Sequence, residues 1–296
     1  MRPRVAAVTL AALLVAMMPG RTSAWGFDVH RFIADKAIDL LPDGLRPFYQ
    51  KHRAFIVEHA VDPDLWRTAG WLEEPPRHFL DLDAYGPPPF AALPREYDRA
   101  VERWGREFVE KNGLLPWRTA EVYGQLQRAF EQQRKGGGGY SLENVKFFSA
   151  VIAHYVADGH VPFHAVLNYD GQLSGQQGIH SRWETELVLR DLPTLKLSPA
   201  PPMPVADART FMFEVLEASF RGAEVILKAD ALAVTGRDAY DDEYFSILDR
   251  ETRPLLEKQL SSAISDVASV IYGAWDAAGR PALALDAAKE VRKIKK

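Results

Sequence analysis

The 296-residue chain contains no cysteine, so neither disulfide bonds nor thiol chemistry can contribute to its stability or activity. It also lacks a basic excess, because 36 lysine and arginine residues stand against 40 aspartate and glutamate residues. This balance argues against a nucleic-acid binder that relies on a basic surface, so any attraction to phosphate must be local. Without disulfides, the fold must be stabilised by its hydrophobic core or by bound metal ions.

No apolar run of the sequence is long enough to span a bilayer. The run Val5–Met18 has 14 residues, whereas a transmembrane helix needs roughly 20. Because arginines precede this run and a proline and a glycine end it, residues 1–24 are predicted to be an export signal, cleaved after Ala24. The mature protein would begin at Trp25 and would be secreted or periplasmic, without a membrane anchor.

What the chain does have is helical periodicity, since apolar residues recur every three or four positions. The clearest stripes are at residues 32–41, 145–155 and 211–220. A further long helix is predicted from near Glu251 through Trp275. Loops rich in glycine, proline or serine are predicted at 86–89, 136–139 and 198–204. No alternating segment rivals these stripes, so an all-α fold in a single domain over residues 25–296 is predicted.

The densest chemical signal is a set of five polar residues in one short stretch of the chain. They are His154, Asp158, His164, His180 and Glu184. Two histidine–acid pairs among them are spaced i, i+4, which on a helix puts both side chains on one face, about 5 to 6 Å apart. Pro162 should end the first helix and let the next histidine turn back toward the same centre. Imidazole nitrogen and carboxylate oxygen suit zinc, so a zinc site is predicted.

The structural alternative for one such pair is a buried histidine whose hydrogen bond is satisfied by a carboxylate. Two pairs and one further histidine favour a metal cluster instead. Five buried polar groups all need compensation, and a shared group of metal ions compensates them together.

Upstream, Trp25 is followed five residues later by His30, and Asp64 precedes His78 by 14 residues. With these residues in place, the mature chain resembles the superfamily that unites secreted single-strand-specific nucleases with bacterial zinc-dependent phospholipases C. The resemblance implies an all-α fold with three zinc ions in a cleft. It also implies that the free amine and carbonyl oxygen of the first mature residue, Trp25, bind zinc. The middle and the final third of the chain resemble the superfamily only as helices.

The resemblance implies three groups of ligands. Asp64, His78, His154 and Asp158 would hold one zinc ion, Trp25, His30 and again Asp158 its neighbour, and His164, His180 and Glu184 the third. Asp62 is a rival for the position of Asp64, but only Asp64 has both the 14-residue interval to His78 and an arginine, Arg67, three residues later. Three histidines match no ligand position and are predicted to be surface or structural residues: His52, His59 and His160.

Features of both branches of the superfamily are present. The interval from Trp25 to His30 and the string Asp64–Arg67 resemble the nucleases, in which the arginine contacts phosphate. A phenylalanine at the position of Phe79 occurs in both branches and stacks a base in the nucleases, although plain core packing is an equal alternative. Glu184 and the lack of cysteine resemble the phospholipases C.

The predicted activity is zinc-dependent hydrolysis of a phosphodiester. Single-stranded nucleic acid or a 3'-nucleotide is the predicted substrate, with a phospholipid headgroup as the alternative. A zinc-activated water would attack phosphorus, oriented by Asp64, while Arg67 stabilises the charge on the phosphate. A secreted helical protein in which zinc only holds the fold is a further alternative, but ligand sets that leave room for water favour catalysis. No obligate protein partner is predicted.

Overall fold

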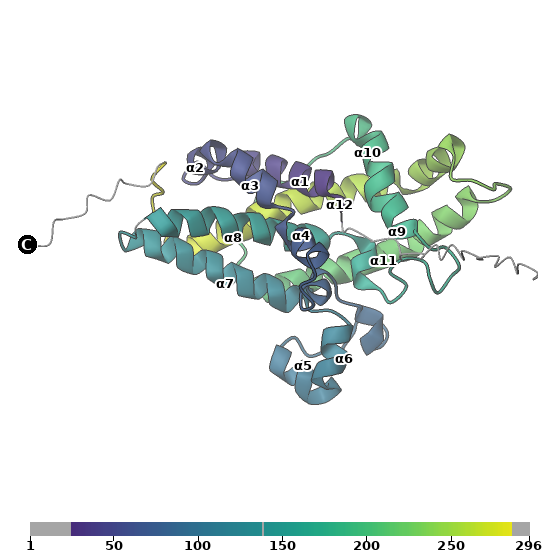
Figure 1. Ribbon diagram of the computed structural model, residues 1–296, viewed down its shortest axis with the longest axis horizontal. Coiled ribbons are helices and arrows are strands. Elements are labelled where there is room, and N and C mark those ends of the chain that lie inside the picture. The colour runs from purple at the N-terminus through teal and green to yellow at the C-terminus, as the bar shows by residue number, and fades with distance from the viewer. Residues whose placement is uncertain (1–24, 138, 286–296) are drawn as a thin grey trace, which may run out of the picture.

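The computed structural model describes residues 25–137 and 139–285; the predicted export signal, residues 1–24, lies outside the described residues. Within these ranges the chain forms helices and loops without a strand, which confirms the predicted all-α class (Figure 1). No helix among the described residues is both long enough and apolar enough to cross a bilayer.

Twelve α-helices follow one another along the described residues. They are α1 (Phe27–Leu40), α2 (Arg46–Lys51), α3 (Arg53–His59), α4 (Asp62–Thr68), α5 (Tyr97–Trp104), α6 (Arg106–Lys111), α7 (Leu115–Arg134), α8 (Gly139–Asp158), α9 (Ile179–Ser181), α10 (Val188–Asp191), α11 (Ala208–Ala233) and α12 (Asp242–Ala277). Four short 3-10 helices, η1 (Pro75–His78), η2 (Leu82–Tyr85), η3 (Pro162–Ala165) and η5 (Leu192–Thr194), and the π-helix η4 (Arg182–Leu187) complete the set.

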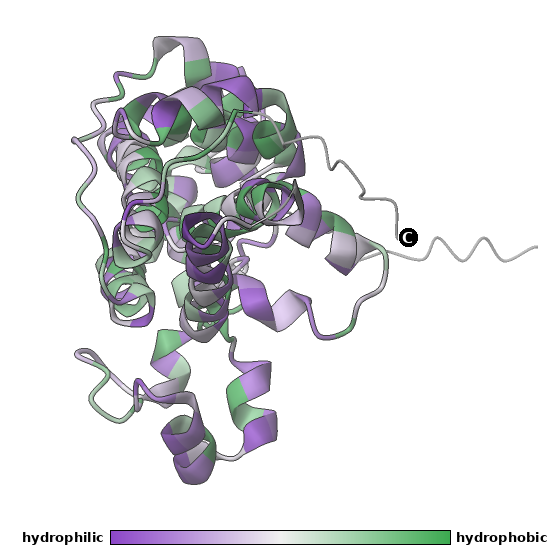
Figure 2. Ribbon diagram, turned by 90° about the vertical axis from the view of Figure 1, so that its left-hand side faces the viewer, coloured by the Kyte–Doolittle hydropathy of each residue, from purple (hydrophilic) through white to green (hydrophobic). Residues whose placement is uncertain are grey.

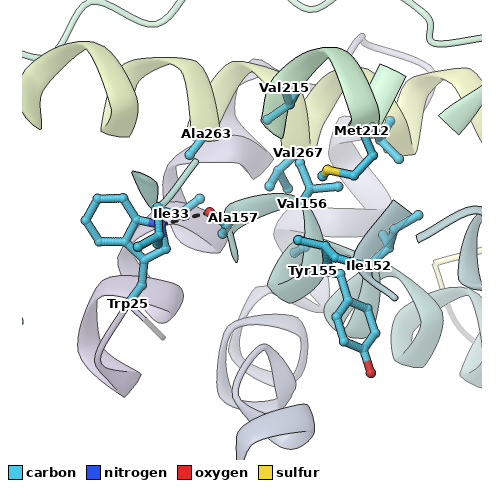
Figure 3. Packing of buried hydrophobic residues seen from close by; sticks show 14 of the residues in the cluster. Trp25, Ile33, Ile152, Tyr155, Val156, Ala157, Met212, Val215, Ala263 and Val267 are labelled. Atoms are coloured by element: carbon cyan, nitrogen blue, oxygen red, sulfur yellow. Dashed lines mark hydrogen bonds between the residues drawn. The ribbon is translucent and has the colours of Figure 1, made fainter. Parts of the chain in front are cut away.

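Helix α8 lies at the centre of the bundle, where it contacts α1, α3, α7 and α12. The longest helices run along the long axis of the molecule, and α5 and α6 project to one side (Figure 1). Hydrophilic and hydrophobic residues alternate along most helices, as expected of amphipathic helices that bury one face (Figure 2). Around α8, Ile152 and Val156 pack in one buried cluster with Met212 of α11 and Val267 of α12 (Figure 3).

The three predicted stripes lie in α1, α8 and α11, and the predicted loops 86–89 and 198–204 fall between helices. The predicted loop 136–139 extends one residue too far, because α8 begins at Gly139. The predicted start of the last helix near Glu251 is wrong, because α12 begins at Asp242. The side chain of Asp241 caps this helix by accepting a hydrogen bond from Tyr244 N at 2.8 Å. The helix then continues through Pro254, even though a proline removes one backbone hydrogen bond.

The end of α8 sets up the candidate site. The helix stops at Asp158, and Val161 N donates to Asp158 O at 3.0 Å to close the turn that follows. Pro162 is the first residue of η3, where its missing N–H costs no hydrogen bond. The chain therefore reverses within a few residues and brings His164 back beside the end of α8, as the sequence predicts.

Candidate metal centre

Asp158 lies at the centre of a fully buried group of histidines that come from three different elements. Its Oδ1 lies 3.4 Å from His30 Nε2 of α1, and its Oδ2 lies 3.0 Å from His78 Nδ1 of η1. The same Oδ2 lies 3.3 Å from His154 Nε2, one turn earlier on α8. Together with Asp64 of α4, these residues are called the Asp158 cluster below.

The Asp158 cluster contains two overlapping sets of potential metal ligands. Donor atoms of His30, His154 and Asp158 lie within 4.8 Å of one another, and so do those of Asp64, His78 and His154. His154 Nε2 is 3.1 Å from His78 Nδ1, and the rings of His30 and His154 stack with their centroids 3.9 Å apart. Histidine nitrogens and carboxylate oxygens that converge in this way match the donor preference of zinc.

A second set of donors, called the Glu184 cluster below, consists of His164, His180 and Glu184, with donor atoms within 4.8 Å of one another. His180 Nε2 lies 3.0 Å from Glu184 Oε2, which also accepts a hydrogen bond from the backbone N of Trp25 at 3.1 Å. Glu184 stands on the π-helix η4, a type of helix that is rare and often occurs at functional sites.

Trp25 is anchored so that its backbone meets this cluster. Its side chain is fully buried, and its indole Nε1 donates to Ala157 O at 2.8 Å, next to Asp158 (Figure 3). Its ring also packs against Trp183 of η4, with centroids 5.8 Å apart. The predicted first residue of the mature chain is thus fixed beside both clusters.

The hydrogen bonding of the two clusters fits bound metal ions. Among the described residues, several buried atoms have no hydrogen-bond partner: both ring nitrogens of His30 and of His180, His78 Nε2, Asp158 Oδ1 and Glu184 Oε1. Buried polar atoms are rarely left unsatisfied. Except for His78 Nε2, which faces Glu74, these atoms gather at one place and are zinc-type donors, so bound metal ions would account for them.

Electrostatics within the Asp158 cluster are dominated by ion pairing. Burial opposes the charge on Asp158, but His154, His30 and His78 outweigh it and hold the pKa of Asp158 well below its usual value. Burial likewise opposes the charge on His78, yet Asp158 and Glu74 raise the pKa of His78 to about 9.

The Glu184 cluster behaves in the opposite way, because favourable contacts do not outweigh the burial of Glu184. Burial, reinforced by the charges of Asp158 and Asp64, raises the pKa of Glu184 well above its usual value. Burial lowers the pKa of His164 to about 3 and that of His180 to about 4. These two imidazoles are therefore neutral at pH 7, the form that binds a metal.

A cavity of about 680 Å³ opens beside the clusters and is lined in part by His78, His164 and His180. Arg67 and Phe79 line the same cavity, so the structure brings both predicted substrate-contacting residues to the potential metal ligands. Arg67 Nη2 donates to Asp64 Oδ1 at 2.8 Å. Phe79 is only partly buried, which distinguishes it from the side chains of the hydrophobic core.

The segment that carries His78 and Phe79 is held by Gly113, in the loop before α7. Gly113 has a φ of 101°, and a Cβ at this position would lie 2.1 Å from Phe79 O. Only glycine accommodates both the positive φ and this close approach. The contact allows Leu115 N to donate to Phe79 O at 3.1 Å, which fixes the backbone after His78.

Residues 29–208 match the sequence family described as zinc dependent phospholipase C. The chain belongs to this family. The matched segment contains every side chain of the Asp158 and Glu184 clusters, and it agrees with the superfamily resemblance. The family's description names zinc, whose preferred donors converge in the two clusters.

Other comparisons add little to this family assignment. No curated protein sequence is detectably similar to the chain. Among solved structures, the alpha-toxin of Clostridium perfringens from an avian strain is similar with a TM-score of 0.46 and 13% identity, over 87% of this chain. This chain spans 65% of the toxin chain.

The remaining candidates from the sequence lie outside the two clusters. Asp62 Oδ2 lies 2.8 Å from His59 Nδ1, so the structure brings Asp64, and not its rival Asp62, to the other ligands. His52 Nε2 lies 3.0 Å from Leu285 O, and His160 Nε2 lies 3.0 Å from Asp266 Oδ2. None of these histidines belongs to a potential metal group among the described residues.

Two buried carboxylates near the site were missed by the sequence analysis. Glu74 is fully buried, and its Oε1 lies 3.6 Å from His78 Nε2. Its i, i+4 spacing to His78 is the signal that could have found it. Asp81 lines the cavity with a buried Oδ1 that lacks a hydrogen-bond partner, and burial, with a smaller contribution from Asp83, raises its pKa to about 8.

Proposed function

We propose that the protein is a phospholipase C that hydrolyses the phosphodiester between the glycerol and the headgroup of a phospholipid. The observation that carries this proposal is the family match, whose 180 residues from 29 to 208 enclose both clusters and most of the cavity. The match favours the alternative of the sequence analysis over its main prediction of a nuclease. The mature protein would be a secreted single domain, residues 25–296, with three zinc ions.

The residues that would hold zinc are those of the Asp158 and Glu184 clusters together with the amine and carbonyl oxygen of Trp25. Bound zinc supplies a hydroxide near neutral pH and a positive charge for the phosphate. Asp64 would orient the attacking water and accept its proton. Arg67, whose Nη2 lies 2.8 Å from Asp64 Oδ1, is placed at the cavity wall to stabilise the charge on the phosphate oxygens.

The composition of the cavity suits a lipid headgroup better than a nucleic-acid strand. Its wall includes Leu167, Tyr169 and Leu173, which are exposed large apolar side chains. Two basic side chains, Lys111 and Arg67, line the cavity. Two positive charges are few for a strand that carries one negative charge per nucleotide. Asp81 adds a carboxyl group that would repel a polyanion when it ionises.

Single-stranded nucleic acid is the second candidate substrate. It is favoured by the partly exposed ring of Phe79 in the cavity, since bases stack on aromatic side chains and gain about 1 to 3 kcal/mol each. The pairing of Arg67 with Asp64 also favours this substrate, because the string Asp64–Arg67 resembles the nuclease branch.

Parallel assays of the zinc-loaded mature protein test this proposal. We expect phosphatidylcholine vesicles to be hydrolysed faster than single-stranded DNA, RNA or 3'-nucleotides. Arg67→Ala should lower turnover on every phosphodiester, including bis(nitrophenyl) phosphate. Phe79→Ala should not lower the affinity for oligonucleotides more than the affinity for other phosphodiesters. Faster cleavage of oligonucleotides than of vesicles, together with a loss of about tenfold to a hundredfold in oligonucleotide affinity for Phe79→Ala, would establish the nuclease instead.

A further inference from the structure

Glu74 is a fully buried carboxylate that belongs to none of the potential metal groups among the described residues. It precedes η1, and both of its oxygens are engaged. Oε1 accepts a hydrogen bond from the hydroxyl of Tyr155 on α8, and Oε2 accepts one from Arg77 Nη1 at 2.8 Å. A buried charge that is held from two sides in this way cannot rotate away from its third neighbour, His78.

The third neighbour of Glu74 is the nitrogen of His78 that points away from the metal ligands. His78 Nδ1 faces Asp158 at 3.0 Å, Asp64 at 3.9 Å and the ring of His154, whereas Nε2 faces Glu74 Oε1 at 3.6 Å. The two ring nitrogens therefore have separate environments, one within the Asp158 cluster and one toward Glu74.

Two other histidines of the site show the same division of roles, but with backbone partners. His154 Nδ1 lies 2.9 Å from Ala60 O, and His164 Nδ1 lies 2.6 Å from His78 O. A carbonyl oxygen can only accept a hydrogen bond, so it fixes a proton on the nitrogen that faces it and leaves the other nitrogen with a lone pair. For His78, the partner in the equivalent position is the side-chain carboxylate of Glu74, which a substitution can remove.

We propose that Glu74 is a positioning residue for zinc. Its carboxylate accepts the proton on His78 Nε2, which leaves the lone pair of Nδ1 directed at the ion held by Asp64, His78 and His154. This inference rests on the proposed zinc site. Partners of this kind fix the tautomer and orientation of a histidine ligand, and their loss costs about tenfold to a hundredfold in metal affinity.

Tyr155 links this positioning contact to the body of the bundle. Its hydroxyl donates to Glu74 and lies 3.2 Å from Arg118 Nε of α7. The contact therefore joins α7, α8 and η1 at one point. Tyr155→Phe removes one of the two groups that hold Glu74, without removing its charge, and should have a smaller effect than a change of Glu74 itself.

The test compares Glu74→Gln with Glu73→Gln, a matched change at the adjacent and exposed residue. Zinc affinity is measured on the full mature chain by competition with a chelator, with zinc content determined by atomic emission. We expect Glu74→Gln to weaken the binding of one ion by about tenfold to a hundredfold. Glu73→Gln should stay within about twofold of the wild type, and Tyr155→Phe should lie between them. The visible absorption of the cobalt(II)-substituted protein should change in Glu74→Gln and not in Glu73→Gln.

Two results would overturn the inference, and they can be told apart. If His78→Ala loses an ion while Glu74→Gln and Tyr155→Phe bind zinc as tightly as Glu73→Gln, Glu74 has no positioning role. If His78→Ala also retains the full zinc affinity, the assignment of His78 as a ligand fails as well. Should Glu74→Gln not fold, the zinc affinity and cobalt spectrum of Tyr155→Phe decide, and wild-type values there would overturn the inference.

Discussion

The Asp158 and Glu184 clusters lie side by side and are built from the same residue types, yet they compensate their burial differently. In the first, imidazoles surround a carboxylate and hold the pKa of Asp158 well below its usual value. In the second, burial and the charges of Asp158 and Asp64 outweigh the contributions of Trp25 N and Arg67, and the pKa of Glu184 rises well above its usual value. Ion pairs therefore favour the charged form of the carboxylate in the first cluster, whereas burial favours the neutral form in the second.

This difference indicates that buried ligands of one metal centre can differ in how much their stability depends on the bound metal. A buried ion pair is costly to break, because removing one partner leaves an uncompensated charge. A neutral carboxyl group leaves no such charge behind. Zinc-free protein should therefore respond strongly to changes in the Asp158 cluster and weakly to changes in the Glu184 cluster.

The largest effect is expected for isosteric replacement of the central carboxylate. In zinc-free protein at pH 7, Asp158→Asn should lower the free energy of unfolding by about 3 to 5 kcal/mol, because protonated His78 loses its main partner. Glu184→Gln should cost less than about 1 kcal/mol, since burial already disfavours the charged form of the carboxyl group it replaces. Urea unfolding of both variants measures the difference.

Zinc content provides the companion measurement. Asp158→Asn should lose two ions and Glu184→Gln one, since metal binding is coupled to the ligands of each cluster. His160→Ala is the control, because His160 follows Asp158 closely in sequence but contacts Asp266 instead of a cluster. Equal unfolding costs for Asp158→Asn and Glu184→Gln would refute the proposed contrast between the clusters.

A second, smaller effect is expected at the amino terminus of the mature chain. Trp25 N lies 3.1 Å from Glu184 Oε2, so a free amine there would add a zinc donor beside Glu184. A tag fused directly to Trp25 should therefore remove one zinc ion and lower activity by about tenfold or more, as expected for loss of a zinc contact. Proteolytic release of Trp25 should restore both, as followed by zinc analysis and phosphodiesterase assays. Three zinc ions and normal activity in the uncleaved fusion would show that the terminal amine is not a ligand.

Much of the fold and of the candidate site could be predicted from the sequence because both depend on local spacing. Apolar stripes located α1, α8 and α11, and the i, i+4 pairs located His154 with Asp158 and His180 with Glu184. Asp64 and His78 were found only through the family resemblance, since the two lie on different elements and no local pattern joins them.

What could not be predicted depends on tertiary contacts. The start of α12 is an exception, because its cap at Asp241 is a local signal that the sequence analysis overlooked. Glu74 was missed although its spacing to His78 is regular, because its burial follows from Tyr155 and Arg77, which reach it from other positions. The opposite electrostatics of Asp158 and Glu184 were equally invisible in the sequence, which shows a histidine four residues before each.

A further effect, on the pH dependence of stability, concerns Asp81, a third buried carboxyl group that shares with Glu184 a raised pKa. Its ordinary pKa is 3.8 and its pKa in the folded protein is about 8, so between these pH values unfolding releases a proton that the folded protein retains. The free energy of unfolding therefore decreases as the pH rises through this window. Asp81→Asn removes this dependence, so its stability relative to the wild type should increase by about 3 kcal/mol from pH 5 to pH 7, at about 1.4 kcal/mol per pH unit. Urea unfolding at both pH values measures this, with Asp98→Asn, the same change at an exposed aspartate, as the control. If the difference in free energy of unfolding between Asp81→Asn and the wild type stays constant with pH, a cation or a water molecule stabilises the Asp81 carboxylate. Asp81 would then not share the raised pKa of Glu184.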